Sequence, residues 1–329
     1  MTKVMRVLHA GIFAVAALPW LPARAVTPAP STIGCGDTVL SPGSYVLRAS
    51  CTCEGNGPCI KVSADNVLIN LDNKTLACAP RNPPPERNDT TFGIQASSLR
   101  NFTLMGADPA VARASGKITG CYMGLHAGDG SNLFVDRVDF SGNTYVGVNT
   151  AFSTDVLLTR NIVDGIAGYV GANGHNAYAI AFYGCGTRCV VSSNIVRNVP
   201  AQARAMKPVE GEGVGVVISA GSTGAVVAYN WFENTDESLM AIAVRASDGA
   251  SGIVENNSMT GFWHGVSGTG SLTVKDNRIM MRKASRISQS YGVYGKSGSG
   301  CAADNLIVNY PIAVAPGLAA CGGRNMTYR

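Results

Sequence analysis

Few side chains in this chain can move a proton or hold an anion near neutral pH. Histidine and tyrosine transfer protons, and arginine or lysine neutralises a carboxylate. Of the four histidines, His9 falls in the N-terminal segment, so the central histidines His126 and His175 are the stronger candidates. The proton-transfer candidates are His126, His175, Tyr145 and Tyr183, and the ligand-binding candidates are Asn149, Lys207, Arg245 and Lys296. Because they are scattered along the sequence, only a repeating fold brings them to one surface.

A repeat runs through most of the chain. Segments open with a small residue and an aliphatic one at Gly93-Ile94, Gly124-Leu125, Gly147-Val148, Ala179-Ile180, Gly215-Val216, Ala241-Ile242, Gly265-Val266 and Gly292-Val293. A second apolar strand in each coil ends in an asparagine at Asn161, Asn194, Asn230, Asn257, Asn277 and Asn305. Steps of 23 to 36 residues between starts exceed a hairpin and fall short of strand-helix-strand units. We expect an all-β chain, a single-stranded right-handed parallel β-helix with three sheets and about ten coils.

Alternation along the first strand predicts which side chains leave the core. The aliphatic residue points inward, so its neighbours point outward. This places an outward stripe at Tyr122, His126, Tyr145, Asn149, Tyr183, Arg245, Tyr294 and Lys296. In this register His264 can face inward beside Gly265, which makes it the weaker candidate. Side chains two coils apart are about 10 Å apart, which suits an extended ligand.

Two consecutive coils carry insertions, "GIAGYVGANGHN" with His175 and "VPAQARAMKPVEGE" with Lys207. Loops that rise from neighbouring coils commonly form the wall of a cleft in repeat proteins. We expect the ligand to cross the coils between Gly124 and Gly265, beneath these loops. The alternative is that both are tolerated surface insertions.

The segments "CGDTVLSPGSYVLRASCTC" and "NVLINLDNKTLAC", followed by the repeated coils, resemble right-handed parallel β-helix repeat proteins of the pectin-lyase-like group. That group contains pectate lyases, alginate-active lyases and epimerases, and polygalacturonases. The resemblance extends from Cys35 to the C-terminus and implies β-elimination on a uronate polysaccharide. Under it, Arg245 or Lys207 grips the carboxylate, His126 or His175 is the base, and Tyr145 or Tyr183 donates a proton.

Hydrolysis is one rival reading. Asn234-Thr235-Asp236 and Trp263-His264-Gly265 look like parts of polygalacturonase motifs. The adjacent Asp pair expected between them is missing, since Asp248 stands alone, and Arg278-Ile279-Met280 lacks a basic third residue. Without a carboxylate pair, glycoside hydrolysis lacks its acid and base.

Other readings stay open. A uronate epimerase shares proton abstraction with a lyase, although the Asp-Pro-His-Asp motif of alginate epimerases is absent. A non-catalytic binding or structural solenoid of the cell envelope, or an enzyme for a small non-sugar substrate, fits the small residues on the stripe. The expected partner is therefore a polysaccharide or another extended small-molecule ligand.

The N-terminus predicts export. A basic start, an apolar run over residues 12–18 and the small-x-small site Ala23-Arg24-Ala25 are typical of a signal peptide. We expect residues 1–25 to be removed and residues 26–329 to form one β-helix domain with a disulfide-rich N-terminal cap. The product is expected to be secreted or periplasmic, with no membrane insertion.

Ten cysteines, an even number, all follow the predicted cleavage site, and none has the C-x-x-C spacing of a zinc site. Disulfides are expected, with local pairs at Cys185–Cys189 and Cys301–Cys321. The net charge of +5 falls to +2 once Lys3, Arg6 and Arg24 leave, so a nucleic-acid partner is not implied.

Calcium is the one metal considered. Candidate ligands are Glu210, Glu212, Asp236 and Glu237, which lack the regular spacing of a calcium loop. We favour the interpretation that they are ordinary solvated acids, and no cofactor is expected.

Overall fold

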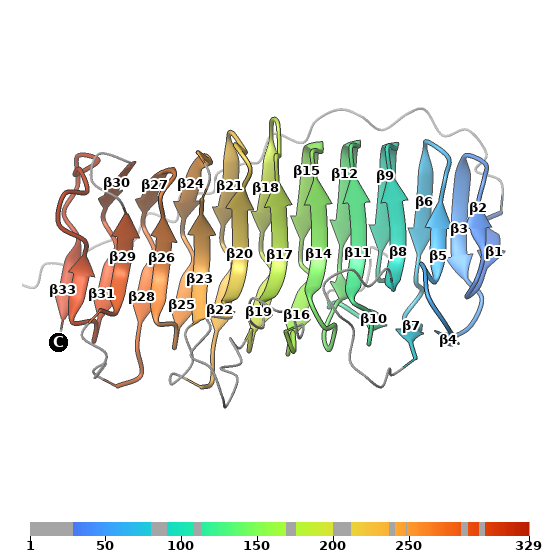
Figure 1. Cartoon of the computed structure of the whole chain (residues 1–329), viewed down its shortest axis with the longest axis horizontal. Helices are drawn as coiled ribbons and strands as arrows, with labels where there is room; N and C mark the ends of the chain where they lie inside the picture. Colours follow the sequence, from blue (N-terminus) through green and yellow to red (C-terminus); the bar gives the residue numbers. More distant parts are fainter. Residues whose placement is uncertain are drawn as a thin grey trace, which may run out of the picture.

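A computed structural model describes residues 29–79, 91–107, 113–168, 176–199, 212–236, 241–247, 249–283, 289–295 and 300–328. The described residues form no helix, and their strands build three parallel sheets of eleven strands each (Figure 1). Apart from the first and the last strand, the chain visits the three sheets in a fixed rotation, so each circuit adds one strand to every sheet. The expected three-sheet, right-handed parallel β-helix of about ten coils is confirmed.

Sheet A contains β1 (Ser31–Ile33), β3 (Gly43–Leu47), β6 (Val67–Asn70), β9 (Arg100–Met105), β12 (Ser131–Asp136), β15 (Thr154–Thr159), β18 (Cys189–Ser192), β21 (Ala225–Ala228), β24 (Ser251–Glu255), β27 (Ser271–Lys275) and β30 (Gly300–Ala303). Sheet B contains β2 (Thr38–Val39), β5 (Ile60–Val62), β8 (Phe92–Ser97), β11 (Met123–Gly128), β14 (Val146–Ala151), β17 (Ala177–Tyr183), β20 (Gly213–Ser219), β23 (Ala241–Ala246), β26 (His264–Gly268), β29 (Tyr291–Gly295) and β32 (Ile312–Val314). Sheet C contains β4 (Cys51–Cys53), β7 (Thr75–Cys78), β10 (Gly116–Thr119), β13 (Val138–Asp139), β16 (Ile162–Asp164), β19 (Ile195–Arg197), β22 (Trp231–Glu233), β25 (Ser258–Thr260), β28 (Arg278–Met280), β31 (Leu306–Val308) and β33 (Met326–Tyr328).

The core is a column of aliphatic side chains enclosed by the three sheets. Sheet B contributes an aligned row of inward aliphatic residues, at Ile94, Leu125, Val148, Ile180, Val216, Val244, Val266 and Val293. Stacking identical positions buries them continuously, because each coil covers the hydrophobic edge of its neighbour.

The small residue before each aliphatic one is required by close packing between coils. A Cβ on Gly215 would lie 2.5 Å from the carbonyl oxygen of Ala243, and one on Gly124 would lie 2.6 Å from that of Gly147. Because Gly215 faces Ala243, the pair of a small and an aliphatic residue that opens the coil on β23 is Ala243-Val244. The expected start at Ala241-Ile242 is therefore wrong by two residues, because Ile242 packs outside the core.

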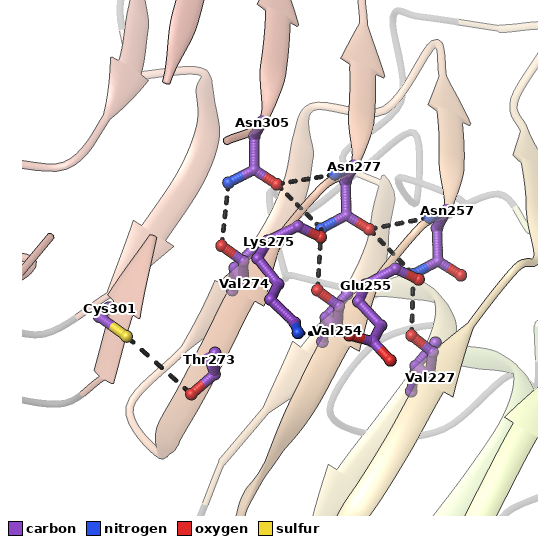
Figure 2. A network of polar contacts seen from close by, with 10 residues as sticks. All are labelled: Val227, Val254, Glu255, Asn257, Thr273, Val274, Lys275, Asn277, Cys301 and Asn305. Carbon is purple, nitrogen blue, oxygen red and sulfur yellow. Dashed lines mark hydrogen bonds and ion pairs between the residues drawn. The ribbon is translucent and has the colours of Figure 1, made fainter. Parts of the chain in front are cut away.

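Asparagines make the corner between sheets A and C. The Oδ1 atom of Asn161 accepts a hydrogen bond from the backbone N–H of Val138. In every later member, Oδ1 accepts from the backbone N–H and the Nδ2 of the asparagine one coil earlier, in a ladder that runs from Asn161 through Asn194, Asn230, Asn257, Asn277, Asn305 and Asn325. Figure 2 shows three of them, with Nδ2 atoms that also donate to strand carbonyls such as that of Val254. The residue before each of the first six has φ between 53° and 59°, which turns the chain sharply. The six asparagines read from the sequence are confirmed as turn residues.

All ten cysteines are paired. The expected bridges Cys185–Cys189 and Cys301–Cys321 are confirmed, and the others are Cys35–Cys51, Cys53–Cys59 and Cys78–Cys121. The predicted signal peptide lies outside the described residues. Within the described part of the chain, no helix is long and apolar enough to cross a membrane.

Candidate functional site

Three of the predicted site residues share one row on the outer face of sheet B. The strand register aligns, coil by coil, Lys61, Gln95, His126, Asn149, Ala181, Val217, Arg245, Ser267 and Tyr294. We call this the B row. His126 and Asn149 are neighbours in it, whereas Arg245 lies three strands beyond Asn149, about 14 Å away.

A second outward row lies on the same face, and strict alternation did not predict it. It aligns Phe92, Met123, Val146, Tyr178, Val214, Ile242, His264 and Tyr291. In the strand pairing Met123 and Leu125 each have a partner, whereas Gly124 between them has none. Met123 therefore lies on the outer face although Leu125, two residues later, is in the core. The inward placement considered for His264 is therefore wrong.

His126 and Asn149 form the polar centre of the site. The Nδ2 of Asn149 lies 3.0 Å from Nδ1 of His126, and the ring of Phe92 packs 5.0 Å from the imidazole. Burial lowers the pKa of His126, opposed by the negative charge of Asp129, so the ring is neutral at pH 7. With Asn149 donating to Nδ1, the remaining proton sits on Nε2.

Asn149 also has a buried carbonyl oxygen with no hydrogen-bond partner. A half-turn of the carboxamide would bring Oδ1 onto an Nδ1–H and leave the Nε2 lone pair free. One orientation makes His126 a proton donor, and the other makes it a base.

A hollow of about 270 Å³ adjoins this pair along the B row. Five of its seven lining residues are polar, namely Lys61, Ser63, Gln95, Ser97 and Ser98, and the other two are Val62 and Leu99. Lys61 brings an exposed cation two strands from His126, about 10 Å away. Neither Lys61 nor Gln95 is among the residues predicted from the sequence. The coil of Lys61 opens on Cys59-Ile60 and lacks the small-residue signal, whereas Gln95 directly follows the repeat start at Gly93-Ile94.

The middle of this face is an apolar cluster separate from the core. It consists of Val146, Ala181, Val214, Val217 and Ile242, each at most 4% exposed. Tyr145 and Tyr183, the two predicted proton donors, pack against it. We call these five residues the outer apolar cluster.

The two tyrosines lie apart from His126. Tyr145 precedes Asn149 by four residues, which is about 13 Å along the strand. It stacks on Tyr122 with ring centroids 5.0 Å apart, and Tyr122 is buried rather than exposed on the outward stripe. Tyr183 lies on β17, in register with Gly128 through Ala151. The register thus brings His126 beside Asn149 but brings neither tyrosine beside His126.

At the far end of the face, charged and aromatic side chains gather around β23, β26 and β29. Arg245 forms an ion pair with Glu212. His264 is stacked by Trp263, with centroids 3.8 Å apart, and also lies against Tyr291 and Tyr294. Its Nδ1 accepts the backbone N–H of Tyr291 over 3.2 Å, and burial lowers its pKa to about 4. This imidazole is neutral at physiological pH.

The remaining predicted residues are placed as follows. His175, Lys207, Lys296, Glu210 and Glu237 lie outside the described residues. Glu212, a calcium candidate, has Arg245 as its partner. In the described ranges, the side-chain groups with metal-ligand spacing are cysteines, and all of these are in disulfides. In Asn234-Thr235-Asp236, the segment that looks like a polygalacturonase motif, the Asn234 side chain donates to the backbone carbonyl of Asp236 over 2.7 Å. The chain bends at this segment.

No protein-family model matches the chain, and no curated protein matches it. Solved structures do. The Dettilon tailspike protein superposes with a TM-score of 0.56 at 12% identity, covering 90% of this chain and 60% of the tailspike. The periplasmic alginate epimerase AlgG gives 0.42 at 13% identity, over 87% of this chain and 72% of its own. The AlgE6 A-module from Azotobacter vinelandii, a mannuronan C-5 epimerase, gives 0.40 at 14%, over 90% of each chain. At these identities the likeness concerns the fold, and this chain spans less than two thirds of the tailspike.

Proposed function

We propose that the chain is an exported carbohydrate-active protein that binds a uronate-containing polysaccharide along the B row and cleaves it by β-elimination at His126. The observation that carries the proposal is the hydrogen-bonded pair of His126 and Asn149, next to a hollow bordered by Lys61. Solved structures with a similar fold include the periplasmic alginate epimerase AlgG and the mannuronan C-5 epimerase AlgE6.

The chemistry needs three groups. Lys61 neutralises the carboxylate of a bound uronate, which acidifies the proton on the adjacent carbon. His126, neutral because burial lowers its pKa, removes that proton through Nε2 once Oδ1 of Asn149 holds the Nδ1–H. The electron pair forms a carbon–carbon double bond as the glycosidic C–O bond breaks, and the leaving oxygen takes a proton from solvent or a side chain. No oxidant and no added water are consumed.

Incubating the mature protein with polygalacturonate, polymannuronate and polyguluronate tests the reaction, with the unsaturated product followed in the ultraviolet. His126→Ala should lower turnover by about 10² to 10⁴, the usual worth of one acid-base group. Thr103→Ala, on the outer face of sheet A, serves as the matched control and should leave turnover unchanged. Full activity in His126→Ala would place the chemistry elsewhere.

A binding protein without catalysis is the second candidate. The specific observation in its favour is that Ala181 and Val217 interrupt the B row between Asn149 and Arg245, so ionisable groups do not continue across the middle coils. Saturable binding of a uronate chain without any unsaturated product, on every polymer in the panel, would select this candidate over the lyase.

A further inference from the structure

Two large aromatic side chains are exposed where the chain enters strand β22 of sheet C. Trp231, the first residue of β22, is 47% exposed, and Tyr229, at the preceding corner, is 61% exposed. Neither belongs to the core or to the outer apolar cluster of sheet B. A flat, half-exposed indole on a rigid sheet costs little conformational entropy when a ring stacks on it.

The indole is held in place by a charged network. The guanidinium of Arg197 lies over the Trp231 ring, 5.2 Å from its centroid. Glu233 lies 3.6 Å from Nε of Arg197 and 2.8 Å from a terminal nitrogen of Arg282. Nε of Arg197 is itself buried and has no hydrogen-bond partner. One carboxylate between two guanidinium groups orders this part of the surface before any ligand binds.

A further cation lies in the same row as the indole. The register aligns Ile195, Trp231, Ser258 and Arg278, so Arg278 is two strands from Trp231, about 10 Å away. Arg278 is exposed, and its side chain contacts the thioether of Met280. Among the described acids, none forms an ion pair with Arg278.

We propose that Trp231 and Arg278 form a second glycan-binding platform on sheet C, which holds an acidic polysaccharide without cleaving it. A sugar ring stacks its C–H face on the indole, and the carboxylate of a nearby sugar accepts from the Arg278 guanidinium, whose planar fork matches a carboxylate. The choice of an acidic sugar rests in part on the proposed function, whereas the platform itself rests only on sheet C.

The platform is suited to binding rather than to catalysis. Its acid, Glu233, is engaged by two arginines, and no histidine lies among the residues of the row. Because Trp231 belongs to a different sheet from His126, a chain held on sheet C is not at the catalytic pair. The platform would instead raise the local concentration of polymer around the B row.

Intrinsic fluorescence separates the two surfaces. Beyond the predicted cleavage site the chain has two tryptophans, Trp231 on sheet C and Trp263 beside His264 on sheet B. Trp263→Phe therefore leaves Trp231 as the reporter of the platform, and Trp231→Phe leaves Trp263 as the reporter of the sheet B face. Each is titrated with tetramers of galacturonate, mannuronate and guluronate, and with neutral maltotetraose.

We expect at least one uronate tetramer to change the emission of Trp263→Phe saturably, with maltotetraose giving no saturable change. Adding Arg278→Gln should raise the dissociation constant at least tenfold, whereas the control Arg188→Gln, an exposed arginine at another turn, should not. Any one of three results would overturn the platform. These are no response of Trp231 to any uronate tetramer, an equal response to maltotetraose, and unchanged affinity in Arg278→Gln. The lyase assay is independent of these titrations, so failure of one proposal leaves the other intact.

Discussion

At the scale of single residues, the orientation of the Asn149 carboxamide sets which nitrogen of His126 carries the proton. As donor to Nδ1 it leaves a proton on Nε2, and as acceptor it leaves Nε2 free. Both states require a neutral imidazole, which burial provides by lowering the pKa of His126. The proposed role therefore depends on a contact one coil away.

Replacing Asn149 by Asp tests that contact. A carboxylate accepts from Nδ1–H and favours the imidazolium, so the pKa of His126 should rise. Because a base works only when unprotonated, the acid limb of the pH–rate profile should move upward by about one pH unit or more. Asn149→Ala is the comparison, with reduced turnover and no upward shift. A superimposable acid limb in wild type and Asn149→Asp would show that His126 is not the base.

His264 makes stability depend on pH. Its folded pKa of about 4 is lower than its ordinary value of 6.5, so the unfolded chain binds the proton first. Stability should therefore fall as the pH drops from 6.5 toward 4 and level off below that. The wild type should lose about 3 kcal/mol more than His264→Gln between pH 7 and pH 4. Urea unfolding at a series of pH values measures this, and parallel curves for the two proteins would contradict it.

At the scale of elements, the asparagine ladder joins neighbouring coils at the corner between sheets A and C. Oδ1 of Asn230 accepts from both N and Nδ2 of Asn194, at 2.9 and 3.0 Å, and all these groups are buried. The ladder satisfies backbone groups that the sharp turn leaves without a strand partner. It therefore links the turn to the stacking of coils.

Asn230→Ala should remove these acceptors and lower the free energy of unfolding by about 3 kcal/mol, since buried donors are left unpaired. Asn132→Gly is the matched control, because Asn132 lies in an exposed asparagine ladder and has φ of 55°, which glycine adopts freely. Chemical denaturation compares the two, and equal losses would mean that burial of the ladder carries no special weight.

At the scale of the whole molecule, the stability of each coil depends on the coils next to it, because each coil packs only on its neighbours. The C-terminal end is closed by Cys301–Cys321, and Leu318 packs against the core there. Sheets B and C form separate faces of one solenoid (Figure 1).

Replacing Cys301 and Cys321 together by Ala should lower stability by about 2 to 4 kcal/mol, the usual worth of a bridge across such a loop. The loss should stay local. Hydrogen exchange should quicken in β30 to β33, while amides of β11 to β18 keep their protection. Uniform loss of protection along the solenoid would show that the coils unfold as one cooperative unit.

The sequence by itself determined the architecture, because a solenoid repeats its packing demands. A small residue must precede the inward aliphatic residue where two backbones approach each other, as at Gly215. An asparagine must supply the hydrogen bonds of the buried backbone groups at the corner, as at Asn230. Both demands recur from coil to coil through most of the solenoid and so become visible as a pattern. Short-range disulfides such as Cys185–Cys189 follow from proximity along the chain.

Only the tertiary structure decided which side chains meet on the surface. Lys61 joins the row of His126 through strand pairing, although the coil that contains Lys61 carries no repeat signal. His264 turned outward because the ladder skips the small residue beside it, which strict alternation does not anticipate. Tyr145 shares the sheet of His126 but lies at the far end of its strand. Side-chain direction and strand register depend on backbone pairing between segments that are distant in the sequence. Local periodicity therefore predicts which residues fill the core of a coil, but it does not predict which residues meet on its outer face.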